Sequence, residues 1–205
     1  MIENAFFKLT DHKVDSIGGF ELLPSWWSRF YEYPWAMRFA RPGDEVADMG
    51  CGWHFRPLKN ALAQVVDAVY AIDAHDGVLE LEVPSNVSLV QADFTHRIQP
   101  LKDRSLDRVF CISVLEDLEA GDMIYPALLE FSRLVRDDGK IVCTFDTPFD
   151  ETKPTPHYPG LNLDRFIRTA ADAGLRFEGE IDTDKANAVV HSDYNLAVFH
   201  AVLTL

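Results

Sequence analysis

Basic residues are scarce in this sequence. Lys and Arg number 19 against 33 Asp and Glu in a chain of 205 residues, which gives a formal net charge of −14 at pH 7. An acidic surface repels phosphate backbones, and the sequence contains no block of basic residues to offset that repulsion. The composition therefore disfavours nucleic acid as a substrate or partner and favours a small-molecule substrate.

Long apolar runs are absent as well. No segment approaches the roughly 18–20 consecutive apolar residues that a helix needs to cross a bilayer. The first eight residues, Met1 to Lys8, include an early acid and lack the basic start and apolar core of a signal peptide. We expect a chain with no membrane association.

Cysteine is rare, with three residues at wide spacing: Cys51, Cys111 and Cys143. The last two lie inside apolar, strand-like runs, so buried free thiols are expected rather than disulfides. This usage fits a reducing cytoplasm. The seven histidines show no recognisable metal-ligand spacing, and His75-Asp76 beside Asp73 is better interpreted as a turn. No Gly-x-Ser-x-Gly elbow or paired-cysteine motif is present.

From residue 43 onward, strand-like and helical segments alternate. A chain of this length with 47% hydrophobic and 25% charged residues is expected to form one α/β domain with a full core. The alternation predicts a parallel sheet with helices on both faces. Strands are predicted near 45–49, 68–73, 87–93, 106–113, 140–145, 175–181 and 195–205, and helices at 57–66, 122–135 and 162–174, with a proline-rich loop at 146–160.

The first 42 residues form a separate N-terminal segment of this single compact domain, followed by the domain proper at 43–205. Ser25 is placed to cap a helix rich in aromatic residues, and Pro34 permits a new helical turn. One interpretation is that this helix packs on the domain. The other is a lid over a ligand pocket that also shapes the substrate site. The aromatic residues at helical spacing are Trp26, Trp27, Phe30 and Tyr31.

The stretch from Val46 to Gly52 organises the rest of the chain. It reads as an apolar strand, an acid, a tight turn and the start of a helix, where Gly50 and Gly52 allow a ligand to approach the backbone closely. The dinucleotide-binding pattern needs a third glycine at position 55, which is Phe55. In addition, the Asp48 carboxylate would repel a pyrophosphate. An acid there suits a cationic ligand, such as an ammonium or a sulfonium.

Acids end three successive predicted strands: Asp48, Asp73 and Asp93. Right-handed crossovers bring the carboxyl ends of parallel strands to one edge, where open α/β sheets bind ligands. We therefore expect the three carboxylates to meet in one crevice.

This arrangement resembles the class I S-adenosylmethionine-dependent methyltransferases, whose first motif is written Asp-x-Gly-x-Gly-x-Gly. The third glycine of that motif falls here on His54. The stretch Ser113-Val-Leu-Glu-Asp-Leu is similar to the Ser-Val-Leu-Glu-His-Val of many small-molecule members, with Asp117 where histidine is common. The resemblance implies a Rossmann-like, seven-stranded, mostly parallel sheet with helices on both faces and an antiparallel last strand.

The resemblance also implies S-adenosyl-L-methionine as cofactor and S-adenosyl-L-homocysteine as product. Asp73 then pairs with the ribose hydroxyls, while Asp93 and Phe94 hold the amino group and face of the adenine. The residues expected to cradle the methionine part are Asp48, Gly50 and Gly52. Cys51, Ala74 and Ser113 complete the expected binding set.

The function implied is methyl transfer to a small-molecule or metabolite-type acceptor. Such a displacement needs alignment more than a conspicuous catalytic residue. A general base could help a hydroxyl or amine acceptor, although loop polarity and helix capping are the preferred interpretation of the candidates. Those candidates are His157, Tyr158, Glu116 and Asp117, and the segments expected to form the acceptor site are 26–37 and 148–160.

Two other functions stay open at this point. A non-catalytic S-adenosylmethionine-binding or interaction protein is suggested by His54, whose ring could obstruct the cofactor loop. A nicotinamide oxidoreductase is disfavoured by Phe55 and Asp48. The sequence gives no indication of the oligomeric state.

Overall fold

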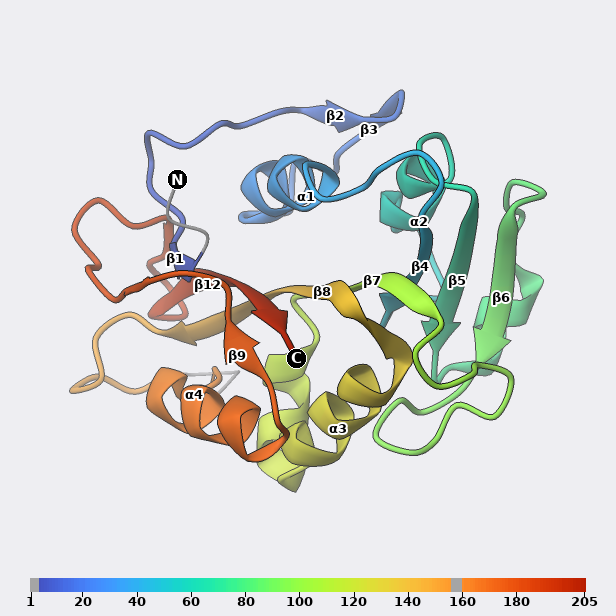
Figure 1. Cartoon of the computed structure of the whole chain (residues 1–205). Coiled ribbons are helices and arrows are strands. Elements are labelled where there is room, and N and C mark those ends of the chain that lie inside the picture. Colours follow the sequence, from blue (N-terminus) through green and yellow to red (C-terminus); the bar gives the residue numbers. More distant parts are fainter. Residues whose placement is uncertain (1–3, 156–159) are drawn as a thin grey trace.

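A sheet runs through the centre of the molecule (Figure 1). The structure is a computed structural model that describes residues 4–155 and 160–205. In this part of the chain the strands are ordered β10-β1-β12-β8-β7-β4-β5-β6, and β9 and β11 also pair with β12. The long strands are β4 (Glu45–Met49), β5 (Ala68–Asp73), β6 (Val87–Gln91), β7 (Leu106–Ile112), β8 (Val135–Pro148) and β12 (Leu196–Thr204). The short strands are β1 (Asn4–Phe6), β9 (Arg176–Phe177), β10 (Ile181–Asp182) and β11 (Val190–His191).

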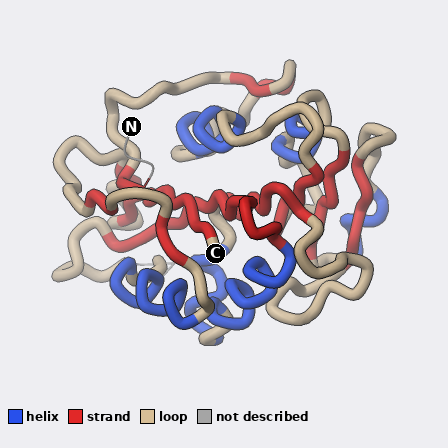
Figure 2. Tube along the Cα trace, viewed as in Figure 1, coloured by secondary structure: helices blue, strands red, loops and turns tan. Residues whose placement is uncertain are grey.

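Helices cover both faces of this sheet (Figure 2). On one side lie α1 (Arg29–Met37) and α2 (Leu58–Leu62), and on the other lie α3 (Ile124–Leu134) and α4 (Leu163–Asp172). Two 3₁₀ helices, η1 (Asp76–Glu80) and η2 (Leu115–Gly121), follow β5 and β7, and a small hairpin of β2 (Ser16–Ile17) and β3 (Phe20–Glu21) precedes α1. Neighbouring strands from β6 to β8 are parallel, whereas β12 is antiparallel to β8. The predicted Rossmann-like fold with an antiparallel last strand is confirmed.

The sheet has more strands than the seven predicted. The segment expected as one strand at 175–181 is divided into β9 and β10, and the chain adds β1 and β11 at the same edge. Strand β1 lies between β10 and β12, with Ala5 opposite His200 and Phe6 opposite Phe199. The N-terminal segment therefore contributes a strand to the main sheet ahead of its aromatic helix, where no strand was predicted.

Two predicted helices have different bounds. The segment expected to be helical from residue 57 to 66 forms α2 only as far as Leu62, because the β-branched pair Val65-Val66 favours leaving the helix through turns before β5 begins. The aromatic helix begins at Arg29 rather than at Ser25, with Pro34 inside it. By contrast, Asn162 caps α4 as predicted, since its side chain accepts a hydrogen bond from the Arg165 N–H at 2.9 Å.

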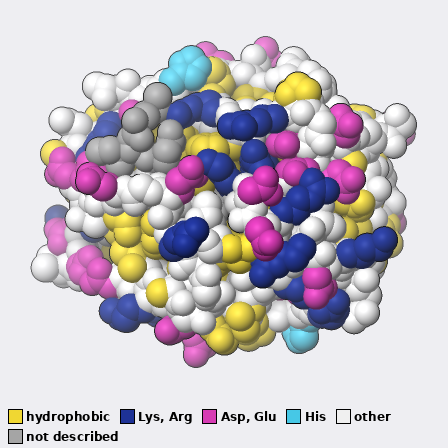
Figure 3. Space-filling model, viewed as in Figure 1, with side chains coloured by type: hydrophobic (Ala, Val, Ile, Leu, Met, Phe, Trp, Pro, Cys, Tyr) yellow, Lys and Arg dark blue, Asp and Glu magenta, His cyan; other side chains and the backbone are white. Residues whose placement is uncertain are grey.

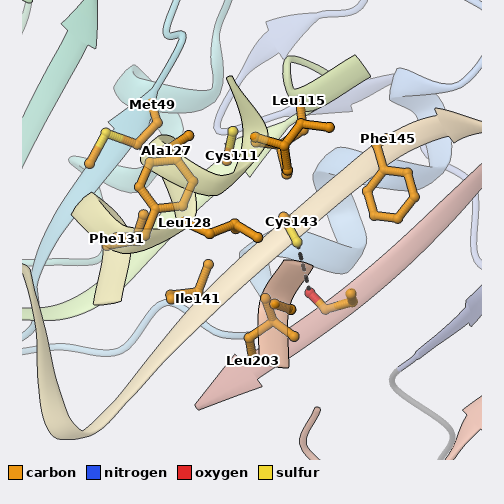
Figure 4. Packing of buried hydrophobic residues seen from close by; sticks show 14 of the residues in the cluster. Met49, Cys111, Leu115, Ala127, Leu128, Phe131, Ile141, Cys143, Phe145 and Leu203 are labelled. Atoms are coloured by element: carbon orange, nitrogen blue, oxygen red, sulfur yellow. Dashed lines mark hydrogen bonds between the residues drawn. The ribbon is translucent and has the colours of Figure 1, made fainter. Parts of the chain in front are cut away.

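Apolar side chains fill both interfaces between sheet and helices. On the α3 side, Phe131 and Leu128 pack against Met49, Cys111 and Ile141 of the strands (Figure 4). Cys143 lies in the same layer, and its thiol donates to the Ala201 carbonyl oxygen at 3.7 Å. Cys111 and Cys143 are buried free thiols, as predicted, and Cys51 is buried and free as well.

The surface mixes charges of both signs. On the face shown in Figure 3, Lys and Arg side chains are interspersed with Asp and Glu. Within residues 4–155 and 160–205, no helix is both long and apolar enough to span a membrane.

Candidate functional site

A cavity of about 380 Å³ opens at the carboxyl ends of β4, β5 and β7. Its position follows from register, because β4 lies between β5 and β7 in parallel and Asp48 is aligned with Ala71 and Phe110. The residues that line it include the predicted Asp48, Gly50, Cys51, Gly52, Asp73 and Ser113, together with Arg29, Tyr33, Trp53, His54, Arg56, Leu58, His75, Ile112, Val114 and Asp117. Most of the predicted binding set is thus brought together at one edge of the sheet.

The turn after β4 needs its two glycines. Gly50 and Gly52 have φ values of 70° and 75°, in the left-handed region. A Cβ at Gly50 would lie 2.6 Å from Cγ2 of Val114, and one at Gly52 would lie 2.6 Å from Cγ of Arg56. The turn therefore brings bare backbone to the cavity wall. His54, at the place of the third motif glycine, is exposed and outside the left-handed region, so its side chain is accommodated without backbone strain.

A buried lysine holds this turn from behind. Nζ of Lys59, on α2, donates to the carbonyl oxygens of Cys51 and Arg56, each at 3.0 Å. These two bonds fasten both ends of the loop that carries Trp53 and His54. Sequence reasoning did not include Lys59; the available signal was a lysine on the buried face of a short helix beside Leu58 and Leu62.

Asp48 is the buried acid of the cavity, with 4% of the residue exposed. Burial raises its pKa to about 7, the positive charge of Lys59 opposes that shift, and the negative charge of Asp73 adds to it. A cationic ligand group placed here would restore the ionised form. The geometry is therefore suited to a positively charged ligand, as expected from the sequence.

Asp73 faces the same turn from the end of β5. Its Oδ2 accepts a hydrogen bond from the Gly52 N–H, and its Oδ1 accepts one from the His75 N–H, both at 2.9 Å. Each carboxylate oxygen has a second lone pair, so the group can still accept two hydroxyl donors. Beside it, the ring of Trp53 stacks on His75 with centroids 4.3 Å apart.

Three predicted binding residues do not line this cavity: Ala74, Asp93 and Phe94. Asp93 does follow β6 on the same edge, but its Oδ1 accepts bonds from the backbone N–H and hydroxyl of Thr95, at 2.9 and 2.7 Å. The Phe94 ring packs into the core, 5.4 Å from Phe131. Asp93 and Phe94 both lie beyond the end of β6 at Gln91, where the Asp93 side chain turns back to its own loop and the Phe94 ring turns toward α3.

Ser113 joins the cavity to α1. It has φ of 47°, and its hydroxyl donates to the buried carboxylate of Glu32. Glu32 also accepts hydrogen bonds from Thr144, Arg29 and, at 2.8 Å, the Ser28 hydroxyl. This network docks the aromatic helix on the ends of β7 and β8. Sequence reasoning passed over Glu32, although one acid inside an aromatic helix is a signal for a buried polar contact.

Of the four candidate general bases, two can be placed. Asp117 lines the cavity, and Glu116 is buried next to it on η2. His157 and Tyr158 lie outside the described residues. Within the described ranges, 4–155 and 160–205, no group of three or more His, Cys, Asp or Glu side chains is arranged to hold a metal ion.

The fold and this cavity define a class: α/β proteins that bind a ligand at the carboxyl edge of a mostly parallel sheet. Comparison with known proteins shows which members of this class the chain resembles. A family described as a methyltransferase domain matches residues 47–143, which contain the glycine turn and the cavity acids Asp48, Asp73 and Asp117. No curated protein sequence matches the chain.

Solved structures give the same fold. A TehB-like SAM-dependent methyltransferase from Corynebacterium glutamicum is 19% identical with a TM-score of 0.60, covering 84% of this chain and 86% of that one. A geranyl diphosphate methyltransferase in complex with GPP and sinefungin is 13% identical with a TM-score of 0.63, covering 86% and 79%. The [4+2]-cyclase SpnF is 12% identical with a TM-score of 0.69, covering 97% and 88%. The chain is thus similar to S-adenosylmethionine-dependent methyltransferases in its fold and, over residues 47–143, in its sequence.

Proposed function

We propose that this protein binds S-adenosyl-L-methionine in the cavity at the ends of β4 and β5 and transfers its methyl group to a small-molecule or metabolite-type acceptor, leaving S-adenosyl-L-homocysteine. The observation that carries the proposal is the placement of Asp48 and Asp73 on either side of a turn that only glycine can form. The family supports a methyltransferase role, and the acidic composition supports an acceptor other than nucleic acid.

The residues present fit the cofactor. Its sulfonium and ammonium charges match the buried carboxylate of Asp48, and its ribose diol matches the two oxygens of Asp73. The bare backbone at Gly50 and Gly52 admits a ligand where any side chain would collide with Val114 or Arg56. When bound, the cofactor supplies a methyl group already activated on sulfur.

The chain's own residues hold the walls of the cavity in place and keep water out of it. Lys59 fixes the turn, and the Glu32 network fixes α1 over the ends of β7 and β8, where Ser113 and Arg29 line the cavity. Such an enclosure aligns the acceptor and keeps water out, which is most of what methyl transfer requires.

Isothermal titration calorimetry with S-adenosylmethionine, S-adenosylhomocysteine and NAD tests the cofactor. Binding of the first two with dissociation constants in the micromolar range or below, and no heat with NAD, is the expected result. Submicromolar binding of NAD alone would identify a nicotinamide protein instead.

A second function deserves its own test: a non-catalytic S-adenosylmethionine-binding or interaction protein. A cyclase stands among the similar structures, so this fold by itself does not fix methyl transfer. Incubation with S-adenosylmethionine carrying a radioactive methyl group and a metabolite extract distinguishes the two. Labelled small molecules are expected; tight cofactor binding with no labelled product would favour the non-catalytic role.

A further inference from the structure

Three carboxylates gather beside the cofactor cavity, at the ends of β7 and β8. Asp117 lines the cavity, Glu116 precedes it on η2, and Asp146 lies near the end of β8, two residues beyond Thr144, the partner of Ile112. The charges of Asp146 and Asp117 both act on Glu116, and that of Asp117 also acts on Asp146. The three groups thus form one electrostatic cluster, here called the carboxylate cluster.

Two oxygens of the carboxylate cluster are buried without a hydrogen-bond partner. They are Oε2 of Glu116 and Oδ1 of Asp146. Glu116 is 7% exposed, so bulk solvent has little access to its carboxylate. Because nearly all buried polar atoms in folded proteins are paired, two neighbouring orphans next to a ligand cavity indicate a place where a ligand donates hydrogen bonds.

The sign of the missing group follows from the charges around it. Arg29 is the cation that acts on all three carboxylates. Its guanidinium donates to Glu32 and, at 3.2 Å, to the Ser28 hydroxyl, so it is already held within α1 and its N-terminus. One guanidinium thus faces four carboxylates, of which Glu32 and Glu116 are buried, Asp146 is partly buried and Asp117 is exposed, and this leaves an excess of negative charge at this edge of the sheet.

The pKa values of two of these carboxylates are raised in this environment. Burial, and then the charge of Asp146, raises the pKa of Glu116 well above its ordinary value. Burial raises the pKa of Asp146 to about 7, and the charge of Glu32 adds to the effect. A ligand that brings both N–H donors and a positive charge would relieve both the missing hydrogen bonds and the repulsion.

We propose that Glu116, Asp117 and Asp146 bind the amino group of the methyl acceptor, so that the substrate class is a small primary or secondary amine. The inference rests on the proposed function for its placement, since Asp117 lines the cavity in which the methyl donor is expected. It goes further by assigning the accepting atom as nitrogen.

The carboxylate cluster also provides a route for the proton. An ammonium that enters the cluster gives one proton to a carboxylate oxygen: an N–H bond breaks, an O–H bond forms, and the pair of charges is neutralised. The nitrogen keeps the electron pair with which it can attack a methyl group. The carboxylate with the raised pKa is suited to this transfer, because a general base works best when its pKa is near the operating pH.

Binding of matched small probes tests the assignment without relying on turnover. The ¹⁵N-labelled full-length protein is titrated with n-butylammonium, n-butanol, n-butyrate and, separately, Mg²⁺, and amide shifts of Glu116, Asp117 and Asp146 are followed. Butylammonium is expected to shift these amides with an affinity at least about tenfold above butanol. Equal or tighter binding of butanol or butyrate, a response to Mg²⁺ alone, or no shift up to about 50 mM probe would overturn the proposal.

Variants separate a specific site from general acidity. Glu116→Gln and Asp146→Asn are each expected to weaken butylammonium binding at least about fivefold, whereas Asp193→Asn, at an exposed position, leaves it unchanged. Thermal unfolding confirms that each variant is folded, and two independent variants protect the test against failure of one. Unchanged affinity in both cluster variants would refute the assignment.

Failure of this inference is distinguishable from failure of the proposed function. Calorimetry with S-adenosylhomocysteine on the same preparations reports the cofactor site alone, and the probe titration is run with and without it. Cofactor binding without amine preference would leave a methyltransferase with another acceptor. Amine binding without cofactor binding would retain the carboxylate cluster as an amine site and remove the methyl donor.

Discussion

Two glutamates, Glu130 on α3 and Glu116 on η2, are buried to a similar extent but differ in their hydrogen-bond partners. Glu130 is 6% exposed, and its oxygens accept bonds from the Ile98 N–H at 2.8 Å and from Nε of Arg133 at 2.7 Å. Glu116 is 7% exposed and has an oxygen with no partner. Equal burial therefore marks a completed structural contact in one region and an incomplete one, beside a cavity, in the other.

The surroundings of Glu130 explain why that region is structural. Arg133 also donates to the Leu101 carbonyl oxygen at 3.1 Å and to Asp103 at 2.6 Å, which ties the loop before β7 to α3. Glu130, Arg133 and Asp103 thus all have partners within the chain. At Glu116, by contrast, one carboxylate oxygen has no donor from the described residues, and the proposed substrate would provide that donor.

Glu130→Ala should have the largest effect. It removes the partner of the Ile98 N–H and leaves Arg133 partly uncompensated, so the free energy of unfolding is expected to fall by about 3 kcal/mol. Urea denaturation followed by circular dichroism measures it. A loss below about 0.5 kcal/mol would remove the contrast between the two regions.

The next largest effect is expected in how stability depends on pH. Because the folded-state pKa values of Glu116 and Asp146 are raised, the folded chain binds protons more tightly than the unfolded one. Both groups therefore lower stability as pH rises above about 4, Asp146 up to its folded-state pKa of about 7. Between low and high pH, the free energy of unfolding is expected to fall by at least about 1 kcal/mol less in the double variant Glu116→Gln/Asp146→Asn than in wild type. Unfolding curves at pH 5.5 and 8 test it; identical slopes would contradict the prediction.

Glu116→Gln alone should stabilise the protein by about 1 kcal/mol at pH 8, since the amide carries no charge that burial would penalise. Glu130→Gln is the matched control, equal in burial and chemistry, and should destabilise. Thermal shift measurements compare the two. If both variants move the midpoint in the same direction, the carboxylate cluster is structural as well.

The smallest effects are expected in cofactor binding, where two acids at strand ends differ because one lines the cavity and the other does not. Asp73→Ala should weaken S-adenosylmethionine binding by at least about 1 kcal/mol, because charge-assisted bonds to the ribose are lost. Asp93→Ala should change it by less than about 0.5 kcal/mol, since that carboxylate does not line the cavity and bonds to Thr95 instead. Calorimetry on both variants decides, and an unchanged constant for Asp73→Ala would disprove the ribose assignment.

Local patterns were sufficient for the frame of the site. Alternating strands and helices fix a parallel sheet, right-handed crossovers place the carboxyl ends of β4, β5 and β6 on one edge, and the glycines after β4 identify the turn. Asp48 and Asp73 were predictable for this reason, as was the cap at Asn162.

Tertiary contacts decided what the side chains do there. Whether Asp93 reaches the ligand depends on Thr95 two residues away and on the core that takes Phe94, and neither is visible in strand periodicity. Glu32 meets Ser113 and Thr144, which follow it by 81 and 112 residues, only because α1 lies across the ends of β7 and β8. The sequence determines which groups arrive at the edge of the sheet, whereas packing determines which of them find partners, because a hydrogen bond is satisfied by distance in space rather than by position in the chain.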